Sequence, residues 1–171
     1  MGSQRKTTVP RAPSAGPREQ AGRDAATSGA VVEGPSALGW HSLLADVPLF
    51  RALPKRHLQR VIELVELRRF RAGATIVREG AQGDAFYIVL DGRARVEAAS
   101  GHTTMLGTGK FFGELALLDG APRSATVSAG DVLTAGRIAR PAFLRLIREE
   151  PTIAVGLARG LVAIVRDLQR A

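Results

Sequence analysis

Between residues 67 and 138 the chain alternates short apolar segments with glycine-containing turns, and this pattern restricts the fold more than any other feature of the sequence. Within several segments apolar and polar residues alternate with a period of two, which is typical of strands that bury one face. Short strands separated by regular turns predict a small antiparallel barrel or jelly roll. We expect strands at residues 67–71, 74–78, 85–90, 93–97, 103–106, 126–128 and 132–138.

The turns indicate how neighbouring strands connect. Asp91-Gly92 is a dipeptide typical of a tight hairpin, so it predicts that the strand before it pairs with the strand after it. Ser100-Gly101 marks the next turn, from which the segment 103–106 returns.

Helical patterns precede the strand region. Residues 38–50 mix apolar residues with Gly39 and Pro48, which predicts short helical pieces. Pro54 stands at the start of a clearer helix, where its missing N–H costs nothing. We expect His57 on the polar side of this helix, at the surface. The apolar side is formed by Leu58, Val61, Ile62 and Val65.

Two further helices are predicted after the strands. The first covers residues 140–148, with a proline in its first turn, and Pro151 separates it from the second. The last helix carries apolar residues at a heptad-like spacing over less than two heptads. This seam fits either packing against the roll or a homodimer contact, and the spacing does not decide between them. Its residues are Leu157, Leu161, Ile164 and Leu168.

The stretch 112–127 interrupts the strand pattern with features suited to a small anion. Gly113 opens a helix-compatible run at 114–118, and a helix N-terminus has unpaired N–H groups and partial positive charge. After the turn, Arg123 offers a planar fork for two phosphate oxygens, and Ser124 adds a hydroxyl. Glu114 would repel a phosphate, but it can accept hydrogen bonds from a sugar hydroxyl. Together these groups point to a nucleotide.

This stretch resembles the phosphate-binding cassette of the cyclic nucleotide-binding domain family, found in protein kinase A regulatory subunits, the catabolite activator protein and cyclic nucleotide-gated channels. The shared pattern is Phe-Gly-Glu-Leu-Ala-Leu, a variable turn, and then Pro-Arg-Ser-Ala-Thr-Val, here residues 112–117 and 122–127. The resemblance covers residues 43–169. It implies an α+β, mainly β fold: an antiparallel β-roll or jelly roll (double-stranded β-helix) with N-terminal helices, an inserted phosphate-binding helix and two C-terminal helices.

The resemblance also implies roles for individual residues. Arg123 would pair with the cyclic phosphate, Glu114 would accept the ribose 2′-hydroxyl, and Gly113 would let the backbone come close. The other residues implied to bind the ligand are Leu115, Ala116 and Ala125, through their N–H groups, and Ser124, through its hydroxyl. An alternative for Glu114 and Arg123 is an ion pair that ties the turn together, and Phe111 and Phe112 are expected to be core anchors.

The amino-acid composition argues against several other classes of function. Although the net charge is +8, the basic residues are scattered and aromatics make up only 5%, so we do not expect nucleic-acid binding. There is no cysteine, and the three histidines lie in separate segments, so we expect neither a metal site nor an enzyme. No apolar run is long enough to span a membrane, and we expect a cytoplasmic protein. Residues 1–35 are rich in Pro, Gly and Ser and predict a disordered tail, with one domain at 36–171.

The sequence thus predicts a stand-alone bacterial module that senses a cyclic nucleotide, cAMP by preference or else cGMP. We expect it to relay binding through its C-terminal helices to an effector that the sequence does not identify. Two alternatives remain. One is a transcription regulator of the catabolite activator type without its DNA-binding part, because we expect no helix-turn-helix after the last helix. The other is a degenerate module that binds no nucleotide and serves as an interaction scaffold.

Overall fold

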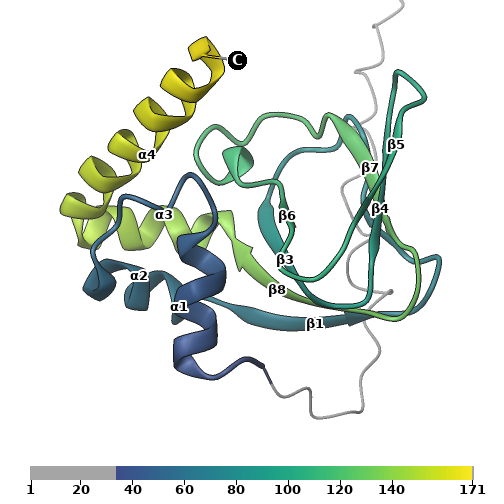
Figure 1. Cartoon of the computed structure of the whole chain (residues 1–171), viewed down its shortest axis with the longest axis horizontal. Helices are drawn as coiled ribbons and strands as arrows, with labels where there is room; N and C mark the ends of the chain where they lie inside the picture. Colours follow the sequence, from purple (N-terminus) through teal and green to yellow (C-terminus); the bar gives the residue numbers. More distant parts are fainter. Residues whose placement is uncertain (1–33, 171) are drawn as a thin grey trace, which may run out of the picture.

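Two four-stranded antiparallel sheets form a roll in the computed structural model, which describes residues 34–170 (Figure 1). In the first sheet the strand order is β1 (Glu66–Phe70), β8 (Leu133–Ala139), β3 (Ala85–Asp91), β6 (Phe111–Phe112). In the second the order is β2 (Thr75–Val77), β7 (Ala125–Ala129), β4 (Ala94–Ala98), β5 (Thr103–Leu106). The predicted jelly roll with added helices is confirmed. Of the strands, only the short β6 was not predicted.

The hairpin predicted at Asp91-Gly92 is wrong. β3 pairs with β6 and β8, whereas β4 pairs with β5 and β7, so the chain crosses from one sheet to the other at this turn. Gly92 has φ +79°, as a tight turn requires, but the turn docks against residues 130–132 instead of closing a ladder. Asp131 accepts the Arg93 backbone N–H at 2.7 Å. Sheet assignment depends on distant partners, which a local turn signal cannot report. The Ser100-Gly101 turn does join the paired strands β4 and β5.

The first sheet lies between two hydrophobic clusters, which explains the continuous apolar run of β3. Phe86 and Ile88 face the cluster shared with the helices, and Tyr87 and Val89 face the second sheet. Phe50 joins the helices to the sheet, with its ring centroid 5.7 Å from that of Phe86. Burial on both faces removes the period-two signal.

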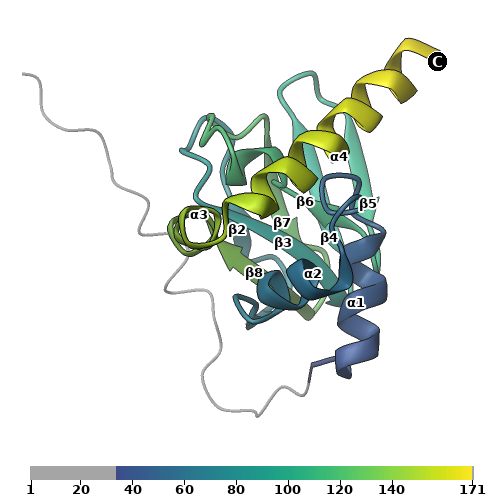
Figure 2. The same cartoon turned by 90° about the vertical axis from the view of Figure 1, so that its left-hand side faces the viewer.

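Four helices pack at one end of the roll (Figures 1 and 2). They are α1 (Ala37–Ala45), α2 (Lys55–Ile62), α3 (Arg140–Glu149) and α4 (Pro151–Arg170). Ser36 caps α1 by accepting the Gly39 N–H at 3.3 Å. Pro54 precedes α2, and a proline lies in the first turn of α3, as predicted. None of these described helices is both long and apolar enough to cross a membrane.

His57 is buried, with 6% exposure, and its predicted place at the surface is wrong. Its Nε2 lies 3.2 Å from Thr152 Oγ1, at the start of α4. On the next turn of α2, Arg60 Nε donates to Glu150 at 2.6 Å. The corner between α3 and α4 therefore covers a side of α2 that amphipathic periodicity alone assigns to solvent.

The predicted seam of α4 divides into two parts. Leu157 is buried in the core at 2% exposure, while Leu168 is 72% exposed. The first part of the seam therefore packs against the body of the protein, and the helix then extends beyond it (Figures 1 and 2). The expected tail at residues 1–35 lies outside the described residues, apart from residues 34 and 35.

Candidate functional site

The stretch from β6 to β7 surrounds a cavity of about 280 Å³. After β6 the chain turns at Gly113, forms a single 3₁₀ turn η1 (Leu115–Leu117), and returns through a loop to β7. This is the interruption that the sequence predicts, shortened to one turn of helix. The cavity is lined by Gly113, Glu114, Leu115, Ala116, Asp119, Ala121, Pro122, Arg123 and Ser124.

Gly113 is required for two independent reasons. Its φ is +77°, a conformation that side chains rarely adopt. A Cβ at this position would also overlap Arg123 Nη1 and would lie 2.9 Å from the Ala85 carbonyl oxygen. The absent side chain therefore makes room for the arginine.

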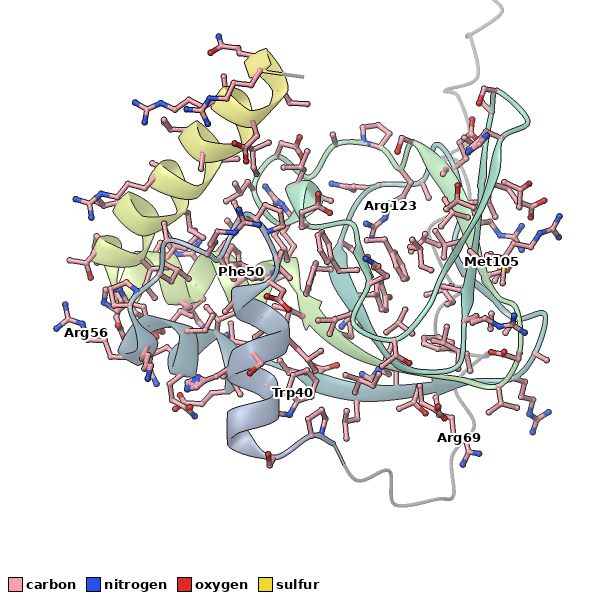
Figure 3. The ribbon with its side chains drawn as sticks, viewed as in Figure 1. Trp40, Phe50, Arg56, Arg69, Met105 and Arg123 are labelled. Atoms are coloured by element: carbon pink, nitrogen blue, oxygen red, sulfur yellow. The ribbon has the colours of Figure 1, made fainter. Side chains whose placement is uncertain are left out.

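Arg123 is buried at 7% exposure, and Figure 3 shows it within the roll beside the cassette. Its Nη2 donates to the Ala85 carbonyl at 2.7 Å and to Asp84 Oδ1 at 3.4 Å. Its Nε and Nη1 are buried without a hydrogen-bond partner among the described residues. Buried donors on a charged group are costly when unpaired, so this guanidinium is suited to an anionic ligand.

Asp84 is a site residue that the sequence reasoning missed. Its carboxylate lies between two arginines, with Oδ1 3.4 Å from Arg123 and Oδ2 3.3 Å from Arg137 Nη2. Its backbone carbonyl accepts the Arg140 N–H at 2.7 Å. The only local signal was an acidic residue directly before the buried strand β3, which turn chemistry alone also explains.

Glu114 is partly exposed at the cavity, directly before η1. The alternative in which it pairs with Arg123 is wrong, because the arginine pairs with Asp84. Within residues 34–170 the Glu114 carboxylate has no hydrogen-bond or ion-pair partner. Since the first N–H in η1 to bond its own turn is that of Leu117, to the Glu114 carbonyl, the N–H groups of Leu115 and Ala116 have no acceptor within the turn.

Ser124 and Ala125 differ in position. Ser124 is exposed and lines the cavity. Ala125 is the first residue of β7, where it lies opposite Ala98, and it is not among the lining residues. The structure thus gathers six of the seven predicted site residues around one cavity and places Ala125 at its edge in the sheet.

Aromatic packing holds β6, the strand that leads into the cassette, against β3. Phe112 stacks on Tyr87 with ring centroids 5.0 Å apart and planes 14° apart. Burial raises the pKa of Tyr87 above its usual value, against the opposing effect of Arg137, so its hydroxyl stays neutral at physiological pH. Phe111 packs against the other cluster, near Phe86. Both phenylalanines are core anchors, as expected.

Arg140 connects the cassette to the helices. It begins α3, and its Nη2 donates to the Leu118 carbonyl, directly after η1, at 2.9 Å. A Cβ on Gly120 would lie 3.0 Å from the Arg140 guanidinium, so a glycine here lets the loop pass over it. Among the described residues no group of three His, Asp or Glu side chains is arranged to hold a metal ion.

The family model described as the cyclic nucleotide-binding domain matches residues 67–150, from β1 to the C-cap of α3, and so includes the whole cassette. These residues belong to the cyclic nucleotide-binding domain family. The match covers the roll and α3, whereas α1, α2 and α4 lie outside the matched residues.

Curated relatives agree with this assignment. The chain is 40% identical over 112 residues to a cyclic nucleotide-gated potassium channel of Rhizobium etli, covering 66% of this chain and 31% of the channel. It is 36% identical over 110 residues to a cAMP-dependent protein kinase regulatory subunit of Aspergillus fumigatus, covering 63% of this chain and 27% of the relative. The chain thus spans less than about a third of the length of either relative.

Solved structures show the same fold. The N-terminal domain of a transcriptional regulator from Streptomyces coelicolor superposes with a TM-score of 0.66 at 26% identity, over 75% of this chain and 96% of that one. The catabolite activator protein of Thermus thermophilus superposes with a TM-score of 0.56 at 31% identity, over 71% of this chain and 60% of that one.

Proposed function

We propose that this chain senses a cyclic nucleotide, with cAMP preferred, and that the ligand binds in the cassette cavity. The observation that carries the proposal is the buried guanidinium of Arg123, which keeps Nε and Nη1 unpaired beside that cavity. A phosphodiester carries one negative charge and two free oxygens, which match an arginine fork. The role is one of binding and not of catalysis.

The ribose would be bound by Glu114. Its carboxylate has no partner within residues 34–170 and borders the same cavity as Arg123. A carboxylate accepts hydrogen bonds from a hydroxyl but repels a phosphate, so the two residues would orient the nucleotide in one direction. The N–H groups of Leu115 and Ala116 and the Ser124 hydroxyl would complete the phosphate contacts.

Ligand binding would be relayed through α3. Asp84 contacts Arg123 through its carboxylate and the first residue of α3 through its carbonyl, and Arg140 contacts the end of η1. A ligand that reorients Arg123 would therefore alter the contacts at the start of α3. This relay is a shift between conformations that bind the nucleotide with different affinity.

The proposal is tested by titration calorimetry with cAMP and with cGMP. Arg123→Ala should weaken binding by about ten- to a few-hundred-fold, since a hydrogen bond to a charged group contributes roughly 1.5–3 kcal/mol. Arg123→Lys keeps the charge but loses the fork, and should also weaken binding. Arg95→Ala removes an exposed arginine from β4 and should leave binding unchanged. The proposal fails if neither nucleotide saturates the wild-type chain at millimolar concentration.

The role of Glu114 is tested separately with 2′-deoxy-cAMP. The wild-type chain should bind this analogue more weakly than cAMP, whereas Glu114→Ala should bind both about equally. If Glu114→Ala still discriminates between the two, the 2′-hydroxyl is recognised by another group, even when Arg123 binds the phosphate.

A second candidate is a transcription regulator of the catabolite activator type. It is favoured by the coverage of 96% of the Streptomyces coelicolor N-terminal domain. Gel-shift experiments with genomic DNA distinguish the two, because sequence-selective and salt-sensitive binding by this chain would favour the regulator.

A further inference from the structure

The outer face of α4 is apolar and unpartnered within the described residues, and none of its residues lines the cassette cavity. Val155, Val162 and Val165 are 55%, 49% and 52% exposed, respectively. Together with Ala158 they follow the spacing 3, 4, 3 along the helix, which aligns them in one stripe. We call these four residues the outer seam.

The orientation of α4 is fixed by its inner face. A Cβ on Gly160 would lie 2.5 Å from the Leu49 carbonyl oxygen, and a Cβ on Gly156 would lie 2.5 Å from Leu53 Cδ2. The helix therefore contacts the loop after α1 at backbone distance, which defines the face of α4 that is buried in this structure. Val162 lies on the side opposite the buried Ile153, since nine residues at about 3.6 per turn are two and a half turns. The outer seam is thus turned away from the buried face of the helix.

A shallow groove, lined by residues of α4 alone, runs along this face. Its small residues, Ala158 and Ala163, make the hollow, and its lining also includes Arg159 and Arg166. Asp167, the one acidic residue of α4, pairs with Arg170 at 3.5 Å. Within residues 34–170, Arg159 and Arg166 have no ion-pair or hydrogen-bond partner.

The positive charge of this face indicates which kind of molecule could bind to it. Two copies of this face would bring the unpaired Arg159 and Arg166 of each copy together, and the one carboxylate in each copy, Asp167, already pairs with Arg170. An anionic bilayer would suit the arginines, but the outer seam has no Leu, Phe or Trp to insert. An amphipathic helix with acidic flanks satisfies both features, since its apolar residues fit the hollow and its carboxylates reach the arginines.

We propose that the outer face of α4 docks an acidic amphipathic helix of a partner protein. The helix would carry apolar residues at alternating spacings of three and four opposite the outer seam, with Asp or Glu opposite Arg159 and Arg166. The partner would bind a surface of α4 and would not contact the nucleotide. This inference therefore goes beyond the proposed function and is independent of it.

The test uses a synthetic three-heptad helical peptide with Leu along its seam and Glu at its flanks, titrated onto the full chain by fluorescence anisotropy. We expect saturable binding that weakens with salt. Val162→Asp should weaken it by about tenfold or more, because it places an unpaired charge in the centre of the contact. Arg145→Glu, on α3 and outside the groove, is the control and should change little.

Charge reversal sharpens the test. The double variant Arg159→Glu/Arg166→Glu should lose the Glu-flanked peptide and should bind a matched peptide with Lys at the flanks. Far-UV circular dichroism and calorimetry with cAMP check that each variant folds and keeps its cassette, so that a failure here is distinguished from a failure of nucleotide binding.

Four outcomes would overturn the proposal. The first is that the wild-type chain does not saturate with the Glu-flanked peptide, and the second is that it binds the Glu- and Lys-flanked peptides equally. The third is a homodimer in sedimentation that Val162→Asp dissociates, which would make a second copy the occupant. The fourth is Val162-dependent binding to vesicles of anionic lipid when the peptide does not bind.

Discussion

The cassette and the C-terminal half of α4 are constrained by the protein in opposite ways. In the cassette each group is held by distant parts of the chain: Arg123 by β3, and the end of η1 by Arg140 of α3. The end of α4 has few such contacts, since Val162, Val165 and Leu168 are exposed. A site for a small ligand needs fixed donors, whereas a surface for a partner needs access.

The first prediction concerns the two parts of α4. Leu157→Ala should lower the free energy of unfolding by about 2–5 kcal/mol, because Leu157 is buried in the core. Leu168→Ala should change it by no more than about 0.5 kcal/mol, since that side chain is exposed. Urea denaturation measures both. An equally large effect at Leu168 would mean that the C-terminal half of α4 is buried in solution. The contrast between the cassette and this half of α4 would then be wrong.

The cassette side of the comparison is tested at Gly113. Gly113→Ala should weaken cAMP binding by on the order of a hundredfold, because its Cβ would displace the Arg123 guanidinium and its φ is +77°. Gly101→Ala is the matched control, with φ +80° and no atom within 4 Å of its Cβ. It carries only the backbone strain and should bind normally. Equal binding by Gly113→Ala would show that Arg123 need not be held in this position.

Alanine substitutions at two glycines on the inner face of α4 should change the stability of the protein to different degrees. Alanine for glycine inside a helix usually stabilises by about 1 kcal/mol, but Gly160→Ala should instead destabilise by roughly 1–3 kcal/mol. Its Cβ would meet the backbone of Leu49, which cannot move aside. Gly156→Ala meets only the end of the Leu53 side chain and should cost less. Thermal unfolding of both variants measures the difference, and the reverse order would contradict this packing.

The smallest effect is expected at Asp131, on the roll surface away from both regions. The backbone N–H of Arg93, and then its guanidinium, lower the pKa of Asp131. A lowered folded-state pKa contributes stability above the unfolded value of about 4, and this stability is lost as the pH falls through the folded-state pKa. Asp131→Asn should therefore be less stable than the wild type at pH 7, and the difference should vanish in acid. A difference that is constant with pH would assign the effect to packing.

Local sequence signals predicted the structure correctly where a residue type has few structural roles. The alternation of short strands predicted the roll. The glycine before a helical turn, followed at a fixed distance by an arginine, predicted six of the residues that line the cavity. Periodicity failed where tertiary contacts decide, as at the Asp91-Gly92 turn, whose strands lie in different sheets, and at His57, which the α3–α4 corner covers.

The sequence by itself therefore determined that the chain carries the motif of the cyclic nucleotide-binding domain family on a β-roll, because that motif is continuous along the chain. Only the tertiary structure decided what Arg123 contacts, since Asp84 lies 39 residues earlier in the chain. It also decided which face of α4 is free. The heptad pattern contains two apolar faces, and the close contact of Gly160 with Leu49 selects the one that is buried.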